Sequence, residues 1–191
     1  MATAVEQANV NAAQLDSAVA CAIHKLRLEA WPHIAERKDG TAGFLMKHWR
    51  DYSGATQHRP IYHLAYAAGD LVAVAHTFAG TIARREGELT IMGLASVCVT
   101  KGERGHGYGR LVVQSAFARV DGGDFEFSLF QTTPAVEPFY LRLGAVEAPN
   151  RFFNSLAEDP SANPFWDPVA MRYPASGFWP TSDIDLLGPG F

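Results

Sequence analysis

A glycine-rich stretch carries the clearest chemical signal in the sequence. Residues 104–109 read Arg-Gly-His-Gly-Tyr-Gly and lie between an apolar segment, 89–99, and an amphipathic one that begins near Tyr108. Backbone N–H groups at the start of a helix have no intrahelical acceptors and lie at the positive end of the helix dipole. Glycines also let a phosphate group approach the main chain. The stretch therefore predicts a site for a phosphate-bearing ligand.

Three phosphate-binding patterns compete for this stretch. A Walker loop ends in Gly-Lys-Ser/Thr, which is missing here. A dinucleotide fingerprint places Gly-x-Gly-x-x-Gly after a first strand, whereas these glycines alternate as Gly-x-Gly-x-Gly after an antiparallel meander. The third pattern, Arg/Gln-x-x-Gly-x-Gly/Ala of acyl-coenzyme A loops, matches Arg104, Gly107 and Gly109. A turn without function is the alternative, although a plain turn needs only one glycine.

Tyr140 is the second residue with a predicted chemical role. It lies four residues before Gly144 in a short helix candidate, 136–143. A thiolate leaving group has a pKa of about 8–9 and a phenol one of about 10, so a tyrosine held in place can protonate a departing thiolate. The alternative is an aromatic core residue on a short helix.

The apolar pattern upstream of the glycine stretch predicts the strands and turns that position it. Three strand candidates are joined by two short turns: strands at 61–66, 71–79 and 89–99, with turns at 68–70 and 84–88. Consecutive strands with short turns form an antiparallel meander. Farther upstream, Asp16 is placed to cap a helix that runs to about Glu29, and an irregular polar stretch, 31–60, follows it.

After the glycine stretch the pattern changes from strands alone to alternating elements. A helix at about 108–120 has apolar residues at helical spacing, and a strand candidate follows at 125–130. Strand, helix and strand then make a βαβ unit with two parallel strands and a right-handed crossover. From Ala145 onward the chain is rich in proline and aromatic residues.

On these residues the sequence resembles the GNAT superfamily of coenzyme A-dependent N-acetyltransferases. The resemblance covers roughly residues 60–145. It rests on the glycine stretch with the strand before it, and on residues 137–145, which are similar to the family's aromatic-Tyr-x-x-x-Gly-aromatic signature except at Ala145. It implies an α/β (α+β) fold. In that fold a mixed, splayed sheet has an antiparallel meander followed by a βαβ unit, with helices on both faces.

The resemblance also implies roles for individual residues. Acetyl-CoA, a cosubstrate, would bind between the two parallel strands and pair with the backbone of Val97 and Val99, on either side of Cys98. The pyrophosphate would be held by backbone N–H groups of the glycine stretch: Arg104, Gly105, His106, Gly107, Tyr108 and Gly109. A neutral amine would attack the thioester directly, a strand N–H would polarise the carbonyl, and Tyr140 would protonate the leaving thiolate.

The C-terminal residues 178–191 are similar to the ends of two GNAT branches that modify the amine at carbon 2 of an amino sugar. Trp179 and Asp183 match the aminoglycoside 2′-N-acetyltransferases, in which the tail Asp helps bind the substrate amines. The ends of nodulation-factor N-acyltransferases contain the dipeptides Trp-Pro, Ile-Asp and Gly-Pro in this order. This chain has the same dipeptides at Trp179-Pro180, Ile184-Asp185 and Gly188-Pro189. The resemblance implies that Asp183, or Asp185 two residues on, orients the acceptor ammonium and takes its proton through water.

The acceptor side of the predicted site is less well defined. Glu29 and Trp31, in the loop expected after the first helix, are candidates for the opposite wall of the acceptor pocket. The two branches carry a Glu two residues before the Val-x-Val segment, where this chain has Ala95. The general base is therefore left open between a tail carboxylate and another group.

These inferences predict an aminoglycoside 2′-N-acetyltransferase that uses acetyl-CoA, has a role in antibiotic resistance and takes kasugamycin-type compounds among its candidate substrates. Three alternatives stay open: an N-acetyltransferase for another small amine or a peptide N-terminus, a longer-chain N-acyltransferase, and a coenzyme A-binding protein without catalysis.

Composition sets the remaining expectations. The 191 residues fit a single domain: an N-terminal helix with acceptor-site loops (1–60), a coenzyme A-binding core (61–145) and an aromatic tail (146–191). A net charge of −4 without a basic block predicts a cationic small-molecule partner and no nucleic acid. No apolar run approaches the roughly 20 residues of a membrane-spanning helix, and no signal peptide is evident, which predicts a cytoplasmic protein. The histidine spacing predicts no metal site, and a homodimer is left open.

Overall fold

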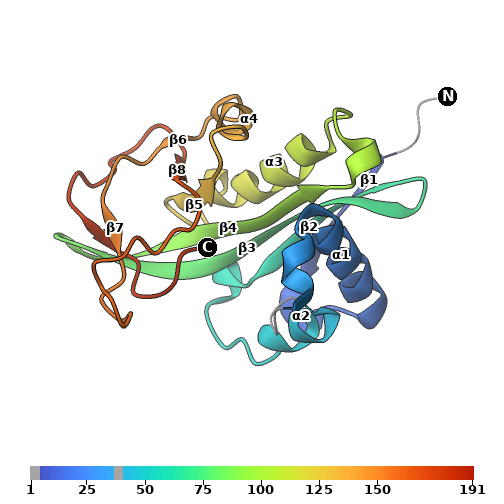
Figure 1. The fold of residues 1–191 in the computed structure, drawn as a ribbon, viewed down its shortest axis with the longest axis horizontal. Helices are drawn as coiled ribbons and strands as arrows, with labels where there is room; N and C mark the ends of the chain where they lie inside the picture. Colours follow the sequence, from blue (N-terminus) through green and yellow to red (C-terminus); the bar gives the residue numbers. More distant parts are fainter. Residues whose placement is uncertain (1–4, 37–40) are drawn as a thin grey trace. The chain divides into compact units, whose positions relative to one another are not determined.

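The computed structural model describes residues 5–36 and 41–191 (Figure 1). These residues belong to two compact units. Unit 1 is drawn from Met1–Phe78 and Ala95–Ala116, and unit 2 from Ala79–Leu94 and Phe117–Phe191. Three elements contribute residues to both units, namely β3 (Asp70–Arg84), β4 (Gly87–Val99) and α3 (Tyr108–Asp121). The prediction of a single domain stays a prediction.

Unit 1 contains an antiparallel set of strands that begins earlier than expected. β2 (Ile61–Ala67) pairs with β3, as predicted, through a turn in which Ala68 and Gly69 have positive φ. β2 pairs on its other side with β1 (Val5–Asn11), which the sequence analysis missed. β1 is a mostly exposed edge strand rich in polar residues, so its sequence lacks the apolar alternation of a half-buried strand.

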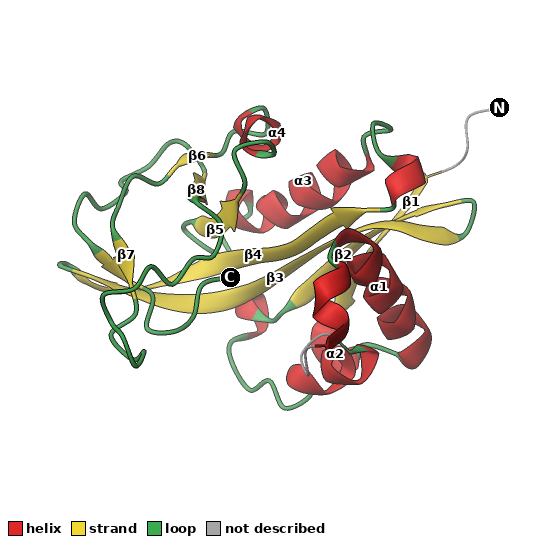
Figure 2. Cartoon of the chain, viewed as in Figure 1, coloured by secondary structure: helices red, strands yellow, loops and turns green. Residues whose placement is uncertain are grey.

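Two helices of unit 1 begin at polar caps (Figure 2). α1 (Ser17–Ala30) starts where predicted, and the Asp16 carboxylate accepts the Val19 N–H at 2.9 Å. α2 (Ala42–His48) starts after Thr41, whose hydroxyl accepts the Phe44 N–H at 3.0 Å. The expectation of an irregular stretch at 31–60 was therefore wrong, because this stretch holds α2 and the 3₁₀ segments η2 (Pro32–Glu36) and η4 (Thr56–His58).

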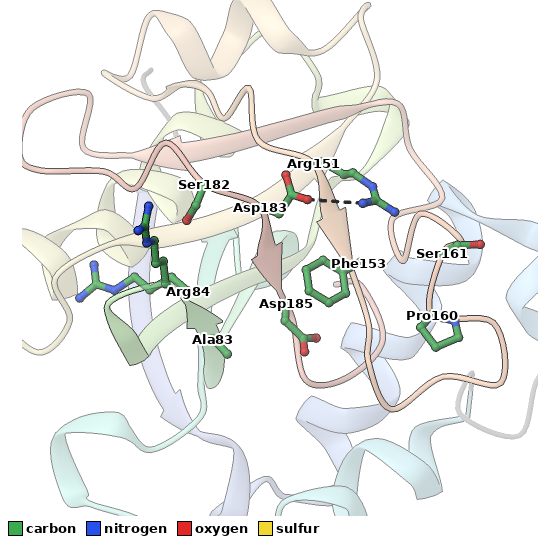
Figure 3. Close-up of a pocket in the computed structure, with 10 residues that line it drawn as sticks. Ala83, Arg84, Arg151, Phe153, Pro160, Ser161, Ser182, Asp183 and Asp185 are labelled. Carbon is green, nitrogen blue, oxygen red and sulfur yellow. Dashed lines mark hydrogen bonds and ion pairs between the residues drawn. The ribbon is translucent and has the colours of Figure 1, made fainter.

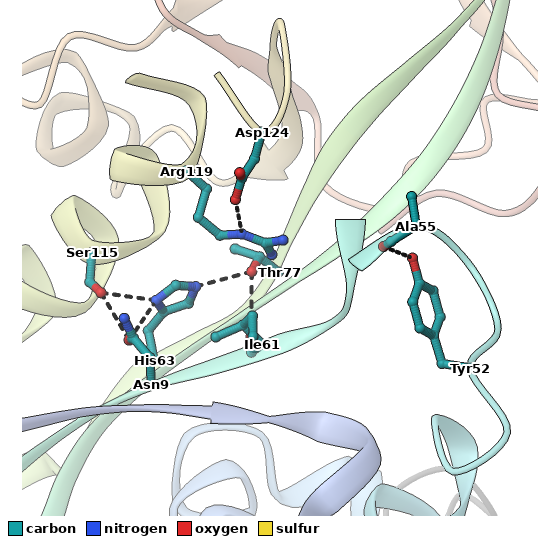
Figure 4. Close-up of polar contacts among 9 residues, drawn as sticks. All are labelled: Asn9, Tyr52, Ala55, Ile61, His63, Thr77, Ser115, Arg119 and Asp124. Atoms are coloured by element: carbon teal, nitrogen blue, oxygen red, sulfur yellow. Dashed lines mark hydrogen bonds and ion pairs between the residues drawn. The ribbon is translucent and has the colours of Figure 1, made fainter. Parts of the chain in front are cut away.

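Helices cover both faces of the strands in unit 1, as the predicted fold class requires. On one face, a hydrophobic core joins α1 and α2 to the strands through buried side chains: Ile23, Leu26, Leu45, Tyr62, Leu64 and Val74. On the other face, His63 of β2 contacts Ser115 of α3 at 3.0 Å (Figure 4). The His63 imidazole is 1% exposed and also contacts Asn9 and Thr77 at 3.0 Å each, so this polar network joins three strands to α3.

In unit 2 the ends of β3 and β4 form a hairpin, beside which parallel and antiparallel strands combine. β4 pairs parallel with β5 (Ser128–Thr132) at only two register positions, Met92↔Ser128 and Gly93↔Leu129. β5 then pairs antiparallel with β8 (Val169–Tyr173), which also pairs with β6 (Val146–Glu147). This mixture of parallel and antiparallel strands with helices confirms the predicted α/β fold class.

Two strand boundaries in unit 2 differ from the sequence prediction, and the tail holds strands that were not predicted. β3 runs five residues past the predicted end at 79, and Ile82 within this extension is fully buried. β5 begins at Ser128 and not at Phe125. Phe125 and Phe127 are buried, as they would be in a strand, but they precede it. The aromatic tail contributes four strands: β6, β7 (Phe152–Phe153), β8 and β9 (Ile184–Asp185).

The tail also builds the core of unit 2. Trp179 is 9% exposed and packs edge-on against Phe127, with ring centroids 5.1 Å apart. Its indole N–H donates to Asn150 Oδ1 at 2.6 Å, and the Asn150 amide donates to the carbonyls of Pro180 and Ser182. The single Asn150 side chain thus fixes the path of the chain from Trp179 to Ser182, just before β9.

None of the helices in the described part of the chain is long and apolar enough to cross a membrane.

Candidate active site

The glycine stretch of unit 1 has an open, left-handed backbone. Gly105 and Gly107 have φ values of +87° and +88°, which disfavour any residue with a side chain. A Cβ atom built at either glycine would meet nothing within 4 Å. The space beside both glycines is therefore free for a ligand group that approaches the main chain.

The first turn of α3 directs its N–H groups out of the helix. The Leu111 N–H donates to the Gly107 carbonyl at 3.1 Å, which is the first hydrogen bond of the helix. The preceding N–H groups, those of Tyr108, Gly109 and Arg110, are the ones that a helix leaves without intrahelical acceptors. Together with the open glycines, they form a cluster of donors at the positive end of α3, which is suited to a phosphate.

Local contacts hold the residues that lead into this cluster. The Arg104 Nε–H donates to the Val99 carbonyl at 3.4 Å, and the His106 Nδ1 lies 3.3 Å from the Glu103 carbonyl oxygen. The Lys101 N–H donates to the carboxylate of Glu29 at 2.5 Å. The structure therefore brings the predicted residues Val99, Arg104 and Glu29 to one region of unit 1.

The sequence analysis expected Glu29 and Trp31 in a loop, but both lie at the C-terminal end of α1. Glu29 belongs to the last turn of α1, and Trp31 is the C-cap residue of that helix, where its N–H donates to the Arg27 carbonyl. Trp31 is half-buried against the core of unit 1. The helix runs one residue farther than predicted, and the Glu29 carboxylate accepts the N–H of Lys101, three residues before the glycine stretch. Their predicted acceptor role stays a prediction.

The end of β4 supplies backbone groups and not a reactive thiol. Cys98 is 6% exposed within the core of unit 1, and burial raises the pKa of its thiol to about 12. Val97 and Val99 alternate with Cys98 along the strand and are half-buried. Ser96 has φ +54°, a left-handed conformation inside a strand, which breaks the regular pleat one residue before Val97. Any pairing of this segment with a ligand therefore uses the main chain.

Tyr140 lies in unit 2, on the short helix α4 (Glu137–Leu141). Its side chain is 5% exposed, and its ring lies 4.7 Å from that of Phe130 and 4.9 Å from that of Phe139. α4 ends at Leu141, two residues before the predicted end at 143, and Gly144 follows with φ +86°. The glycine stretch belongs to unit 1, so the role of Tyr140 towards a coenzyme A thiol stays a prediction.

Asp183 and Asp185 lie in a pocket of unit 2 but in contrasting surroundings (Figure 3). Asp183 is 57% exposed at its side chain and pairs with Arg151 at 3.4 Å. Asp185 is 8% exposed, and its Oδ1 accepts the N–H groups of Ser155 and Leu187 at 3.0 Å each. Burial acts to raise the pKa of Asp185, but the hydrogen bonds from Ser155 and Leu187 outweigh it and lower the pKa overall. Asp185 therefore acts as a structural acceptor in the described chain, whereas the Asp183 carboxylate is exposed in the same pocket.

The sequence analysis missed the basic side of this pocket. Three arginines line it beside the two carboxylates: Arg84, Arg85 and Arg151. Arg84 and Arg85 appeared only as part of a charged turn, because nothing in a single sequence shows that the tip of β3 meets the tail. Among the described residues there is no cluster of three side chains able to hold a metal ion.

Comparisons with known proteins identify the fold. Neither a protein-family model nor a curated protein sequence matches the chain. A GCN5-related N-acetyltransferase from Ralstonia eutropha JMP134 aligns with a TM-score of 0.60 at 15% identity, over 77% of this chain and 95% of that one. An acyl-CoA N-acyltransferase from Pseudomonas aeruginosa aligns with a TM-score of 0.58 at 17% identity, over 88% of this chain and 99% of that one.

A third solved structure is that of an enzyme named for an amino-sugar substrate. Glucosamine-6-phosphate N-acetyltransferase from Arabidopsis thaliana aligns with a TM-score of 0.58 at 11% identity, over 82% of this chain and 99% of that one. The TM-scores establish a shared fold, and identities this low support nothing beyond the fold. The chain therefore has the fold of the GNAT acetyltransferases, as its glycine stretch and Tyr140 segment predicted.

Proposed function

We propose that the protein is an acetyl-CoA-dependent N-acetyltransferase. The observation that carries this proposal is the cluster of donors at the start of α3, where Gly105 and Gly107 leave open space beside the main chain. A diphosphate needs several N–H donors and close backbone approach, and this cluster offers both. The shared fold supports the same assignment, since the aligned structures are named as acetyl- and acyltransferases.

The proposed reaction is a direct transfer of the acetyl group to an amine. The N–H groups of residues 104–110 would hold the pyrophosphate of acetyl-CoA, and the backbone of Val97 and Val99 would bind its pantetheine arm. A neutral amine would attack the thioester carbonyl, forming the C–N bond as the C–S bond breaks. Tyr140 would give its phenolic proton to the departing thiolate, and a carboxylate acting through water would accept the proton of the amine.

For the acceptor we propose the amine of an amino sugar, and specifically the 2′-amine of an aminoglycoside. The resemblance of the tail supports this choice, and Asp183 is the candidate carboxylate because it faces a pocket and is exposed. The Arabidopsis enzyme supports the broader class, since its name shows that this fold can accept an amino sugar. Resistance to an antibiotic, exerted in the cytoplasm, would be the biological role.

A panel of amines with acetyl-CoA, followed by release of free coenzyme A thiol, tests this function. The panel contains kasugamycin, deoxystreptamine aminoglycosides, glucosamine and a short peptide with a free N-terminus, and a series of longer acyl-CoAs is run with the best amine. We expect turnover with an amino sugar and with acetyl-CoA as the preferred donor. Turnover only with the peptide or only with long acyl chains would contradict the acceptor or donor assignment. Coenzyme A binding without any turnover would contradict catalysis.

A further inference from the structure

The pocket that contains Asp183 has features that the proposed transfer reaction does not use. It lies within unit 2, has a volume of about 770 Å³ and is formed by the end of β3 and the tail (Figure 3). This volume falls in the range of about 300–1,000 Å³ that is typical of small-molecule sites. The charges in this pocket indicate which kind of molecule it suits.

The carboxylates of the pocket are already engaged, whereas two of its guanidinium groups are not. Asp183 pairs with Arg151, and Asp185 accepts two backbone N–H groups. No carboxylate in the described part of the chain forms an ion pair with Arg84 or Arg85. The charge that is left uncompensated in the pocket is therefore positive, which favours an anionic group beside these two arginines.

Two residues that line this pocket each have one buried polar atom without a hydrogen-bond partner within the described chain. These atoms are the Nε of Arg84 and the Oγ of Ser182. Buried polar groups are nearly always paired, so an unpaired donor in a ligand-sized pocket indicates a missing acceptor. Both atoms can donate to an oxygen atom, since a guanidinium is donor-only and a hydroxyl rotates to suit its partner.

We propose that this pocket binds an anionic oxygen group of a small molecule, a phosphate or a carboxylate, through Arg84, Arg85 and Ser182. The planar guanidinium matches such groups with two parallel N–H···O bonds, and Ser182 supplies a further donor. Arg151, which pairs with Asp183, borders the site and limits its positive charge. This inference goes beyond the proposed acetyl transfer and does not depend on it.

The test is a titration of the ¹⁵N-labelled protein with sodium phosphate at pH 7, with sodium chloride adjusted to keep the ionic strength constant. The readout is the Nε–H resonance of Arg84, which Arg84→Lys identifies by removing it. We expect a saturable shift of this resonance. Arg84→Gln should weaken phosphate binding by roughly tenfold or more, followed through the backbone amide of Ser182. Arg142→Gln, which removes an exposed arginine outside the pocket, should bind phosphate as the wild type does.

Asp183→Asn gives the sharpest contrast. It releases Arg151 from its ion pair, so phosphate should bind more tightly than in the wild type, whereas a site for a cation would be weakened by the same change. Circular dichroism confirms that each variant is folded. A titration in the presence of saturating coenzyme A shows whether the coenzyme's own phosphates or another molecule supply the anion. No saturable shift at Arg84, unchanged binding in folded Arg84→Gln, or weaker binding in Asp183→Asn would overturn the proposal.

Discussion

Single residues of one short segment show how differently two carboxylates are used. Asp183 and Asp185 are two positions apart, a spacing that places side chains on the same side of an extended backbone, and both line one pocket. They differ in exposure and in hydrogen-bond partners. The sequence analysis named Asp183, or Asp185, as the residue that orients an acceptor ammonium, and that role stays a prediction. The structure shows Asp183 in the pocket beside Arg151 and Asp185 buried, with its oxygen held by two backbone N–H groups.

Asp185→Asn is expected to destabilise the protein at neutral pH by about 1–3 kcal/mol, because a charged acceptor of two backbone N–H groups is lost. The pKa of Asp185 is lowered in the folded state, so its stabilisation is present above the unfolded-state pKa of about 3.9 and is lost as the pH falls below it. Urea unfolding of both proteins at pH 7 and pH 3 measures this.

The difference in unfolding free energy between wild type and Asp185→Asn should therefore shrink from pH 7 to pH 3. Asp183→Asn is the matched control, since an exposed ion pair contributes only about 0–1 kcal/mol. Equal destabilisation by the two substitutions at pH 7 would contradict the structural role of Asp185.

Tyr140→Phe keeps the ring that packs against Phe130 and removes only the proton donor. If Tyr140 protonates the thiolate, kcat should fall by about 10²–10⁴-fold while coenzyme A still binds. Steady-state kinetics with each substrate varied gives both quantities. Tyr173→Phe is the control, because the Tyr173 hydroxyl donates to Asp121 at 2.7 Å and its loss affects stability and not the chemistry. A change in kcat of less than about threefold in Tyr140→Phe would show that another group protonates the thiolate.

The two cysteines are expected to differ in reactivity. Cys21 is exposed, whereas Cys98 is buried with a pKa of about 12. Because the thiolate is the reactive form, a colorimetric thiol reagent at pH 8 should modify only Cys21 quickly in the native protein and both cysteines after denaturation. Rapid reaction of both thiols in the native protein would place Cys98 outside the core.

At the scale of elements, helices and strands with a strong apolar pattern could be predicted from the sequence. Strands whose pairing partners are distant in the sequence could not. β2, β3, β4, α1 and α3 all lie near their predicted places, since each has either a clear apolar face or a polar cap. β1 is polar and exposed, and β8 lies in a segment dominated by proline and aromatic residues, where its pairing with β5 cannot be read locally. α2 is only seven residues long, too short for a clear helical period.

The two ends of α3 offer a matched test of the glycine stretch. Gly107 precedes the helix with φ +88°, and Gly123 follows it with φ +85°, and a Cβ at either position meets nothing within 4 Å. Gly107→Val and Gly123→Val should therefore cost similar backbone strain, and thermal melting should show similar losses of stability. Only Gly107→Val should raise the KM for acetyl-CoA, by roughly tenfold or more, since its side chain occupies the space for the diphosphate. Similar KM values in the two variants would contradict the loop assignment.

At the scale of the whole molecule, the fold was predictable and the acceptor chemistry was not. The glycine stretch and the Tyr140 segment are local motifs, so their residues could be named from the sequence alone. Arg84 and Arg85 come from the end of β3 and Arg151 from the tail, and only the folded unit 2 brings them into one pocket with Asp183. The net charge of −4 suggested a cationic partner, but this pocket is locally basic, because net charge does not report how charges are distributed.

The central claim is that the donors at the start of α3 hold the coenzyme. The most direct measurement is a titration of the ¹⁵N-labelled protein with coenzyme A, followed through the backbone amide resonances. The account predicts saturable shifts that are largest for residues 104–110, whose N–H groups would bind the pyrophosphate, and much smaller shifts at Gly123 and Ser182. No saturable shift, or shifts that are largest around Ser182 and Arg84, would contradict it.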